Sequence, residues 1–448
     1  MTDLITRKPS DWDIKNLENI ATFITKGATP TTYGFEWVEE SSDSIPFLRS
    51  ECVTANGFNR KGMNFISKKA HVTMGRSKIK SGDILMTITG NIGRIATLPD
   101  EIPEANINQH IAKISVIDGV SSSYVAQALQ QERYNRYYER ILTGQAYPQI
   151  SLKQVRETPI LLPPHPEQQK IAEVLSTVDK KIEIIDQKIA ETEKLKTGLM
   201  QKLFSEGVGV QDENGDWQPH SEFKESMYGS IPLCWEVSTF KKLLKSKDVL
   251  GIQDGNHGES HPVSSDFVSE GVPFITANKI SSRNKLLTKS AKKISHEQYK
   301  SLRIGFSKPG DVILTHKGTV GLTAIVSEED GELMMSPQTT YYRLGKNSCL
   351  INSFLYYFFQ SSGFKRVLNQ QSQQSTRAYI GITKQAELSI LIPEPKEQKQ
   401  ISSILNAVDS KLDLLTEQKI EVKKLKKGLM QKLLTGEWRV PVEETEAA

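Results

Sequence analysis

The sequence predicts an α+β protein: two similar globular halves joined by two long antiparallel helices, with pseudo-two-fold internal symmetry. Residues 167–203 recur without a gap as residues 397–433. In both copies apolar residues recur at alternating steps of four and three, which indicates a coiled-coil seam. The other positions are mostly Lys, Glu, Asp and Gln, so neither helix is expected to fold alone and each copy is the natural partner of the other.

The expected seam, whose residues are also candidates for docking a partner, is apolar throughout. It comprises Ile171, Leu175, Val178, Ile182, Ile185, Ile189, Leu199, Leu203, Ile401, Leu405, Val408, Leu412, Leu415, Leu429 and Leu433.

Length and composition indicate a globular chain. Its 448 residues suffice for two or three domains, and it is 37% hydrophobic and 25% charged. No stretch approaches the roughly 18 to 20 apolar residues of a membrane helix, and the N-terminus has no apolar signal core. We therefore expect a cytoplasmic protein without membrane contact. Cys52, Cys234 and Cys349 form no CxxC and predict no disulfide framework or zinc site.

The repeat suggests five segments along the chain. Globular domains are expected at 1–163 and, after a linker, within 207–394; long helices at 164–206 and 395–436; and a C-terminal tail at 437–448. Residues 207–220, rich in Gly, Asp and Asn, read as a linker or exposed hairpin.

The first half is expected to contain short strands and turns. Residues 45–49 form a short extended run, and residues 84–89 and 94–98 flank a Gly-Asn-Ile-Gly turn as a predicted hairpin. Residues 122–142 have helical periodicity.

The second half repeats this pattern. Pro-Phe-Ile-Thr at 273–276 corresponds to Pro-Phe-Leu-Arg at 46–49, and 308–315 corresponds to 80–87. Gln338 is aligned with Gln109. Packing and turn residues recur in the second half, while polar loop residues differ. Either the two copies present different surfaces to similar ligands, or their loops drifted after duplication.

Motifs for catalysis are missing from the sequence. It has no GxxxxGK[ST] loop, no Gly-rich dinucleotide or adenosyl turn, no Asn-Pro-Pro-aromatic tetrapeptide and no nuclease carboxylate pair with ExK. His257 and His261 have a spacing known from metal sites, but the Gly and Pro around them predict a loop, so no metal is expected. Gly90 to Gly93 is either a phosphate cradle or, more simply, a turn. The pattern favours a binding protein over an enzyme.

Basic residues gather at corresponding places in the two halves, leading to each predicted hairpin, as in phosphate-binding surfaces. Those of the second half include Arg283 and Lys285. The alternative is that these basic residues are ordinary solvated charges on loops and bind no phosphate. Side chains able to contact DNA bases or phosphates lie beside the glycine turns and before the extended segments that lead from each half into its long helix. The candidate DNA-binding residues are Arg49, Lys78, Lys80, Thr89, Asn91, Arg94, Asn108, Gln109, Gln145, Gln149, Asn278, Lys279, Lys317, Thr319, Gln338 and Arg377.

Taken in order, these motifs resemble the specificity (S) subunits of Type I restriction-modification enzymes over nearly the whole length. The first half carries PFLR, KSGDILMTITGNIG and INQH, and the second PFIT, KPGDVILTHKGTVG and SPQT. The resemblance also rests on the Pro-x-x-Glu-Gln-x-x-Ile entry at 164–171, whose Pro is Glu394 in the second copy, and on the shared GLMQKL ending.

The resemblance implies a non-catalytic DNA-recognition subunit. Each globular half would be a target recognition domain that reads one half of a bipartite, asymmetric site in double-stranded DNA, and the helices would form the spacer. Two modification subunits would dock on the helices and supply adenine methylation with S-adenosylmethionine. Restriction subunits would add ATP- and Mg²⁺-dependent translocation and cleavage. No cofactor is expected in this chain.

Two other classes of function remain open on the sequence. One is a coiled-coil protein-interaction scaffold without DNA specificity. The other is a nuclease or methyltransferase active on its own, which the missing cofactor and metal motifs disfavour.

Overall fold

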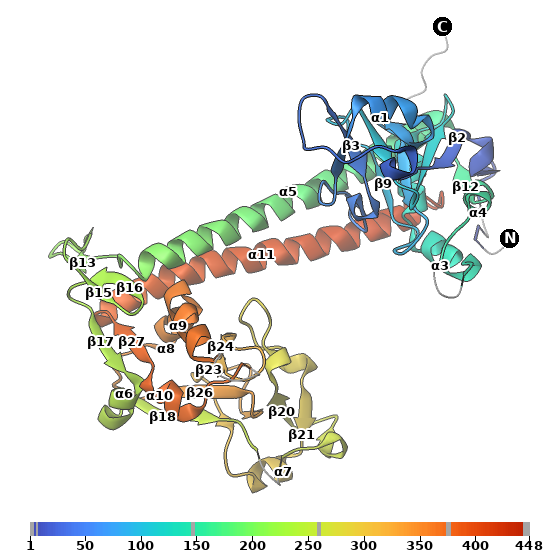
Figure 1. The fold of residues 1–448 in the computed structure, drawn as a ribbon. Coiled ribbons are helices and arrows are strands. Elements are labelled where there is room, and N and C mark those ends of the chain that lie inside the picture. The colour runs from blue at the N-terminus through green and yellow to red at the C-terminus, as the bar shows by residue number, and fades with distance from the viewer. Residues whose placement is uncertain (1–3, 6–7, 145–147, 258–260, 373–377, 442–448) are drawn as a thin grey trace. The chain divides into compact units, whose positions relative to one another are not determined.

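The computed structural model divides into two compact units, residues 1–187 with 417–448 and residues 188–416 (Figure 1). Each unit contains one globular domain and a part of each long helix, α5 (His165–Leu203) and α11 (Pro395–Leu433). The structure describes residues 4–5, 8–144, 148–257, 261–372 and 378–441.

The first unit is built on two four-stranded sheets. One has the order β6-β3-β10-β7 (Asn64–Ser67, Ser44–Leu48, Glu104–Ile107, Lys78–Lys80). The other has the order β2-β11-β8-β9 (Ala21–Lys26, Ile111–Val116, Ile84–Thr87, Ile95–Thr97). The pairing of β3 with β10 is parallel, and the other pairings in these two sheets are antiparallel. Two small ribbons complete the domain: β1 with β12 (Asp13–Asn16, Pro159–Leu162) and β4 with β5 (Val53–Thr54, Gly57–Phe58).

The second unit repeats both sheets. The order β18-β26-β23-β24 (Val249–Asp254, Thr339–Leu344, Val312–Thr315, Thr323–Ile325) matches β2-β11-β8-β9. The order β21-β20-β25-β22 (Lys292–Ile294, Val272–Ile275, Leu333–Met335, Phe306–Ser307) matches the other sheet, with β19 (Phe267–Val268) added at its edge. The ribbon β17 with β27 (Glu236–Thr239, Ser389–Ile392) takes the place of β1 with β12. The predicted α+β repeat is confirmed.

The predicted hairpins are present. Strand β8 pairs with β9 across the Gly-Asn-Ile-Gly turn, as expected. The segment 207–220 forms a small hairpin, β13 with β14 (Val210–Gln211, Trp217–Gln218), and a further hairpin, β15 with β16 (Phe223–Ser226, Gly229–Pro232), follows it.

The predicted helix at 122–142 is in fact two helices, α2 (Ser122–Leu129) and α3 (Glu132–Ile141). The chain turns at Gln131, whose backbone is extended, so that Tyr134 is fully buried and its hydroxyl donates to the Pro159 carbonyl at 2.9 Å. Periodicity alone did not reveal this break because both helices bury a face on the same core. Helices α8 (Asn352–Gln360) and α9 (Ser362–Ser372) repeat the arrangement.

Shorter helices lie at the edges of both domains. They are α1 (Lys68–Thr73), α4 (Leu152–Arg156), α6 (Phe240–Ser246), α7 (His296–Ser301) and α10 (Ile382–Glu387).

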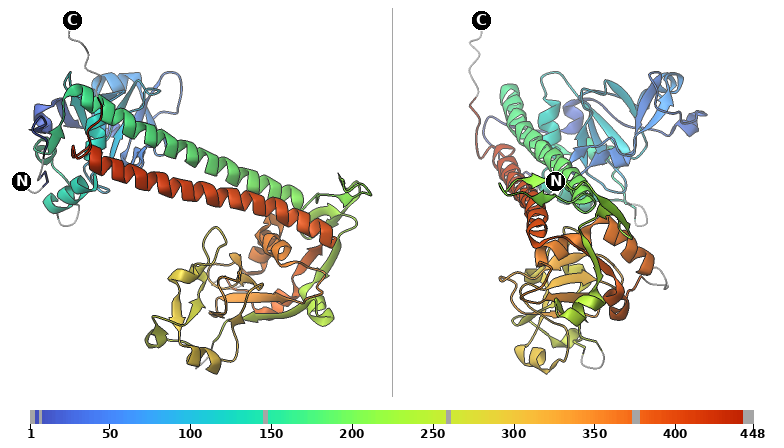
Figure 2. Two further views of the ribbon diagram at one scale, coloured as in Figure 1. Left: turned by 180° about the vertical axis from the view of Figure 1, so that it is seen from behind. Right: turned by 90° about the vertical axis from the view of Figure 1, so that its left-hand side faces the viewer.

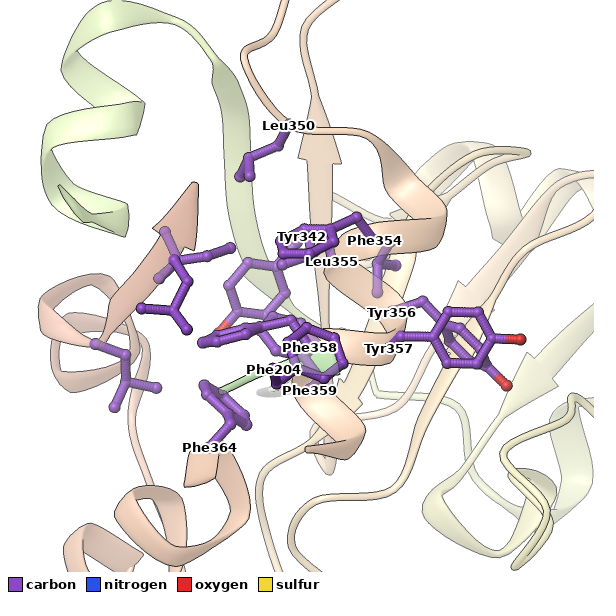
Figure 3. Close-up of a cluster of buried hydrophobic side chains, with 14 of the residues drawn as sticks. Phe204, Tyr342, Leu350, Phe354, Leu355, Tyr356, Tyr357, Phe358, Phe359 and Phe364 are labelled. Carbon is purple, nitrogen blue, oxygen red and sulfur yellow. The ribbon is translucent and has the colours of Figure 1, made fainter. Parts of the chain in front are cut away.

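The second domain has an aromatic core that the sequence places mainly on α8. Phe354, Phe358 and Phe359 are buried there with Tyr342 of β26 and Phe204, which follows α5 (Figure 3). The ring centroids of Tyr342 and Phe359 lie 4.8 Å apart, and the angle between the ring planes is 65°. Aromatic pairs favour such an edge-on geometry. The core therefore joins the end of α5 to the second domain.

The long helices run antiparallel within each unit, side by side (Figures 1 and 2). In the first unit Asp179 pairs with Lys426 at 2.7 Å, and Asp186 pairs with Lys419. A step of seven residues forward on α5 is thus matched by a step of seven backward on α11. In the second unit Lys196 pairs with Asp409 at 2.7 Å in the same register.

The seam positions fall into two groups. The end positions Ile171, Leu175 and Leu433 belong to the core of the first domain, and Leu203, Ile401 and Leu405 belong to that of the second. Of the remaining positions, Ile185, Leu412 and Leu415 are buried. The others are half-buried: Val178, Ile182, Ile189, Leu199, Val408 and Leu429. The ends of the helices therefore serve as parts of the domain cores as well as of a seam.

Each helix starts with a glutamine that is locked to the preceding loop. The Gln168 side chain accepts from the Ser121 N–H at 2.9 Å and donates to the Pro163 carbonyl at 2.8 Å. Gln398 makes the corresponding bonds to Ile351 and Pro393, at 3.0 and 2.8 Å. These paired bonds fix how each domain leads into its helix.

Among the described residues, no helix is long and apolar enough to cross a membrane.

Candidate nucleic-acid interface

The Gly-Asn-Ile-Gly segment of the first domain is a tight turn between β8 and β9. Gly90 and Gly93 have φ values of 72° and 78°, which side-chain-bearing residues rarely adopt. The turn is closed by Thr87, whose hydroxyl donates to the Asn91 carbonyl and accepts from the Arg94 N–H. The turn thereby presents Thr89, Gly90 and Asn91 beside the neighbouring loops.

A chain of hydrogen bonds runs across the loops next to this turn. The Thr29 hydroxyl donates to Oε1 of Gln109 at 2.7 Å, Nε2 of Gln109 lies 3.2 Å from Nε2 of His110, and Nδ1 of His110 lies 2.6 Å from Oγ1 of Thr89. Gln149 continues the surface, since it pairs with Thr89 through a β-bridge. Three loops and a turn therefore converge on one polar surface.

The geometry fixes which groups of this surface donate. An amide nitrogen only donates, so Nε2 of His110 must accept from Gln109, and the neutral ring then carries its proton on Nδ1. That proton is donated to Thr89, so the Thr89 hydroxyl hydrogen has no acceptor among the residues that the structure describes. Gln109, which is exposed, also keeps a second amide hydrogen. The surface can offer donors to the acceptor atoms on a base edge.

The second domain carries different side chains on the same scaffold. Lys317 takes the place of Thr89, and Tyr379 takes that of Gln149, because a Lys317 to Tyr379 bridge repeats the Thr89 to Gln149 bridge. Lys317 is exposed and Tyr379 is 45% exposed. A cation and a phenol replace a hydroxyl and an amide.

Gln338 stands at the position of His110, not of Gln109 as the sequence alignment suggested. The Ile88 N–H bonds to the His110 carbonyl at 2.9 Å, and the His316 N–H bonds to the Gln338 carbonyl at 3.0 Å. The alignment slipped by one residue because Ser-Pro replaces Asn-Gln at the start of the turn. The Gln338 side chain accepts from the Ala277 N–H at 3.4 Å and is exposed.

His316 supports this surface from below. Its Nδ1 lies 2.6 Å from the Thr340 hydroxyl, which also accepts from the Gln385 amide at 3.0 Å. Burial, with a smaller contribution from the Lys317 charge, lowers the pKa of His316 to about 4. His316 is therefore a neutral structural group at neutral pH.

Several predicted residues lie elsewhere in the first domain. Asn108 is buried, and its Oδ1 accepts from the His110 N–H at 3.1 Å, so it shapes the turn. Lys78 and Lys80 lie on β7, an edge strand. Arg49 lies 3.4 Å from Glu51. Arg94 lines a cavity of about 450 Å³ together with residues of α3 and α11.

In the second domain, Asn278 accepts from the Thr276 hydroxyl, and Lys279 donates to Ser290 at 3.3 Å. Thr319 is exposed in the turn after Lys317. Gln145 and Arg377 lie outside the described residues.

Three members of these surfaces were missed in the sequence: Thr29, His110 and Tyr379. Thr29 and Tyr379 lie outside the motifs, and only the fold brings them to the turn. His110 carried a signal, because it lies in the INQH motif beside Gln109.

Metal ligands do not gather in the described part of the chain, where no group of three or more His, Cys, Asp or Glu could hold an ion. His257 and His261 each lie within hydrogen-bond distance of a backbone carbonyl, of Gly255 at 3.2 Å and of Asn256 at 3.0 Å.

Comparisons with known proteins agree with this duplicated plan. The family model of the Type I restriction modification DNA specificity domain matches residues 9–194 and again residues 242–424. The Type I restriction enzyme MjaVIII specificity subunit of Methanocaldococcus jannaschii is 26% identical over 446 residues, which cover 97% of this chain and 94% of that protein. The MjaIX specificity subunit of the same organism is 23% identical over 453 residues, 97% of this chain and 95% of that protein.

Solved structures share the fold. The S subunit of a Type I restriction-modification system from M. genitalium superposes with a TM-score of 0.56 at 14% identity, covering 97% of this chain and 99% of that one. A chain of a type I R-M system, solved in a study of its complex assembly and conformational transition, gives a TM-score of 0.54 at 16% identity, covering 96% and 100%.

Proposed function

Because the chain belongs to the Type I restriction modification DNA specificity family, we propose that it is the non-catalytic subunit that selects the DNA site of a Type I restriction-modification complex. Each globular domain reads one half of a bipartite, asymmetric site in double-stranded DNA. The paired helices hold the two readers and set the number of unread base pairs between the half-sites.

One observation carries this proposal: the same scaffold presents unlike side chains at equivalent places. Thr89, His110 and Gln149 of the first domain correspond to Lys317, Gln338 and Tyr379 of the second. Hydroxyl, imidazole and amide groups suit a different pattern of base edges from a cation, an amide and a phenol. Two different half-sites, and hence an asymmetric site, follow.

The helices support the proposed spacer role. Each has 39 residues, which corresponds to about 58 Å at roughly 1.5 Å per residue. That length exceeds the roughly 34–36 Å between half-sites one DNA turn apart. In this proposal a change in helix length between the two domain cores moves a reader without altering its reading surface.

Partner subunits dock on the outer faces of the helices in this proposal. Two apolar positions on α5, Ile184 (50% exposed) and Leu195 (56%), recur on α11 as Leu414 (48%) and Leu425 (56%). Exposed apolar side chains at repeated places suit two copies of one partner, the modification subunit. Restriction subunits complete the assembly.

Cofactors belong to those partners in this proposal. S-adenosylmethionine binds the modification subunits, and ATP and Mg²⁺ bind the restriction subunits. We place the complex in the cytoplasm, where the chromosomal DNA and these cofactors are available.

The test is a map of methylated adenines in the host with and without this gene. The proposal expects one bipartite motif to be methylated with the gene and to lose its methylation without it. An unchanged methylome, together with partner binding that ignores DNA and salt concentration, would instead support the protein-interaction scaffold.

A further inference from the structure

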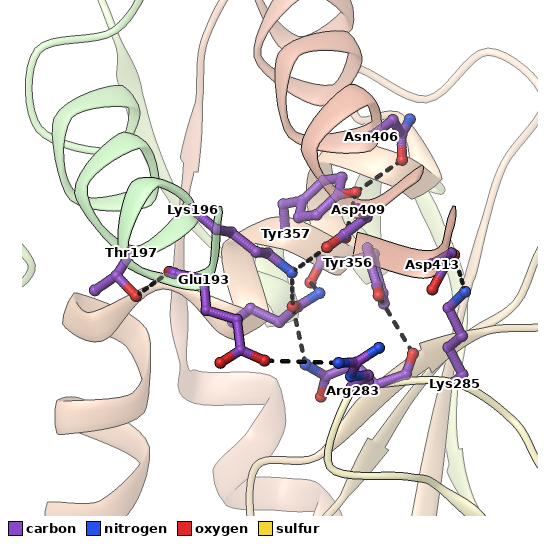
Figure 4. A network of polar contacts seen from close by, with 12 residues as sticks. Glu193, Lys196, Thr197, Arg283, Lys285, Tyr356, Tyr357, Asn406, Asp409 and Asp413 are labelled. Atoms are coloured by element: carbon purple, nitrogen blue, oxygen red, sulfur yellow. Dashed lines mark hydrogen bonds and ion pairs between the residues drawn. The ribbon is translucent and has the colours of Figure 1, made fainter. Parts of the chain in front are cut away.

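A loop of the second domain, residues 281–285, lies against both long helices within the second unit (Figure 4). It joins Ile280 to Leu286, which pair through a β-bridge. The sequence placed the loop's two cations, Arg283 and Lys285, in the basic stripe expected to face DNA. The structure turns both toward the helices instead.

Both cations of the loop have partners on the helices. Arg283 lies 3.7 Å from Glu193 of α5, and it also donates to the Thr416 hydroxyl of α11. Lys285 pairs with Asp413 of α11. One loop thereby holds both helices at once.

The loop is equally fixed to its own domain. Asn284 adopts a left-handed backbone with φ of 59°, its amide donates to Gln360 of α8 at 2.9 Å, and its carbonyl accepts from the Tyr356 hydroxyl at 3.2 Å. Gln360 also accepts from Lys196 of α5 at 3.4 Å, and Lys196 pairs with Asp409. Domain, loop and helices form one polar network (Figure 4).

The first domain has no equivalent cations in this loop. The corresponding turn, residues 54–57 between Val53 and Phe58, is one residue shorter and reads Thr-Ala-Asn-Gly. Thr54 and Ala55 border the cavity of about 450 Å³, with Lys426 and Met430 of α11 also lining it. There α2 and α3 contact the helices, through Gln127 with Asp179 at 2.7 Å and Glu132 with Lys427 at 3.1 Å. Helix α8 of the second domain makes the counterpart of the first of these contacts, Tyr357 with Asp409 at 2.8 Å.

The exposure of the loop's ion pairs indicates a role in orientation more than in folding. The side chains of Lys285 and Asp413 are 51% and 37% exposed, and those of Arg283 and Glu193 are 37% and 56% exposed. Exposed pairs add little to folding stability. Three attachments to two helices nevertheless restrict how the domain can tilt on them.

We propose that loop 281–285 is a strap that fixes the tilt of the second domain on the helix pair and thereby restricts the gap length that the protein accepts between half-sites. This inference rests on the proposed function. Arg283 and Lys285 are positioning residues in this account, and they contact no base.

The test uses the full chain assembled with its modification subunits. Lys285→Glu breaks the pair with Asp413, and Lys285→Glu with Asp413→Lys restores it in reverse. Lys289→Glu is the matched control, since Lys289 is an exposed cation nearby without an ion pair among the described residues. The readout is methylation of a DNA library with fixed half-sites and gaps one base pair shorter or longer than the preferred one.

Lys285→Glu is expected to reduce the preference for the correct gap by about tenfold, since misplacement by about 1 Å costs up to about 10²-fold. The half-sites should stay unchanged, the double variant should recover the preference, and Lys289→Glu should behave as the wild type. Unchanged gap preference in Lys285→Glu, or a changed half-site, overturns the proposal.

A second readout separates the strap from the DNA function. Spin labels on Lys194 of α5 and Lys346 of the second domain report their distance distribution without DNA. The distribution should broaden in Lys285→Glu and narrow again in the double variant. An equally narrow distribution in Lys285→Glu overturns the strap even if the proposed DNA function holds. Broadening in a complex that methylates no bipartite site supports the strap's mechanical part and overturns the proposed function.

Discussion

The indole N–H of Trp12 donates a hydrogen bond of 3.0 Å to the buried carboxylate of Glu167 at the start of α5. Arg439, beyond the end of α11, pairs with the same carboxylate at 2.6 Å. In the second unit Trp235 donates to Glu397 at 2.8 Å, and His220 lies 3.0 Å from that carboxylate. Each glutamate thus ties the tryptophan just before a strand, β1 or β17, to the chain that follows the opposite helix.

Glu167→Ala should destabilise the first domain. The substitution leaves the Trp12 N–H buried without a partner, and such a loss costs about 1–3 kcal/mol in the free energy of unfolding. Denaturant unfolding measures the effect. Glu173→Ala, an exposed residue on the same helix that pairs with Lys170, should stay within about 0.5 kcal/mol of the wild type. Equal effects of the two variants would contradict this role of Glu167.

The ion pair of Lys196 with Asp409 should contribute to helix pairing. The side chains are 18% and 23% exposed, so a double-mutant cycle to alanine should give a coupling of about 1 kcal/mol. The exposed pair of Lys424 with Glu421 on one helix should couple by roughly 0.3–0.5 kcal/mol. A coupling for Lys196 and Asp409 no larger than this control would show that the apolar seam alone sets the register.

The buried His316 makes stability depend on pH. Its pKa falls from 6.5 to about 4 on folding, so the unfolded chain binds the proton more readily. The free energy of unfolding should therefore fall as pH drops from about 6.5 to about 4, by roughly 2–3 kcal/mol from this group. Denaturant unfolding at several pH values measures the slope.

His316→Gln should remove this part of the slope, whatever its effect on stability at pH 7. His296→Gln, at an exposed position on α7, should leave the slope unchanged. A slope that persists in His316→Gln would assign the acid sensitivity to other groups.

Gln109 should specify a base in one half-site only. Gln109→Ala removes the amide hydrogen offered to DNA and should cost about 1–3 kcal/mol of discrimination at one position. Sequencing of methylated adenines shows which half-site has relaxed. Gln338→Ala should relax the other half-site, and relaxation of the same half by both variants would contradict the assignment of one domain to each half.

The architecture was predictable because the sequence contains an internal repeat. The repeated seam predicted paired antiparallel helices, and the shared glycine turns predicted two copies of one domain. Those signals depend on local spacing, so they survive without knowledge of tertiary structure.

The reading surface was only partly predictable because it is assembled from distant segments. Gln109 and Thr89 stood beside motifs, but Thr29 and Tyr379 reach the surface through sheet pairing. Asn108 had the right chemistry for reading DNA, yet the turn uses it internally. Arg283 and Lys285 looked like DNA contacts because charge in a sequence does not reveal its partner.

Exchange of the first reader tests the central claim most directly. Residues 9–163 would be replaced by the corresponding segment of another family member, and methylated adenines sequenced in a host that carries the modification subunits. We predict that one half-site changes to that of the donor while the other half-site and the gap remain. A methylated motif that is unchanged, or changed in both halves, would contradict the account.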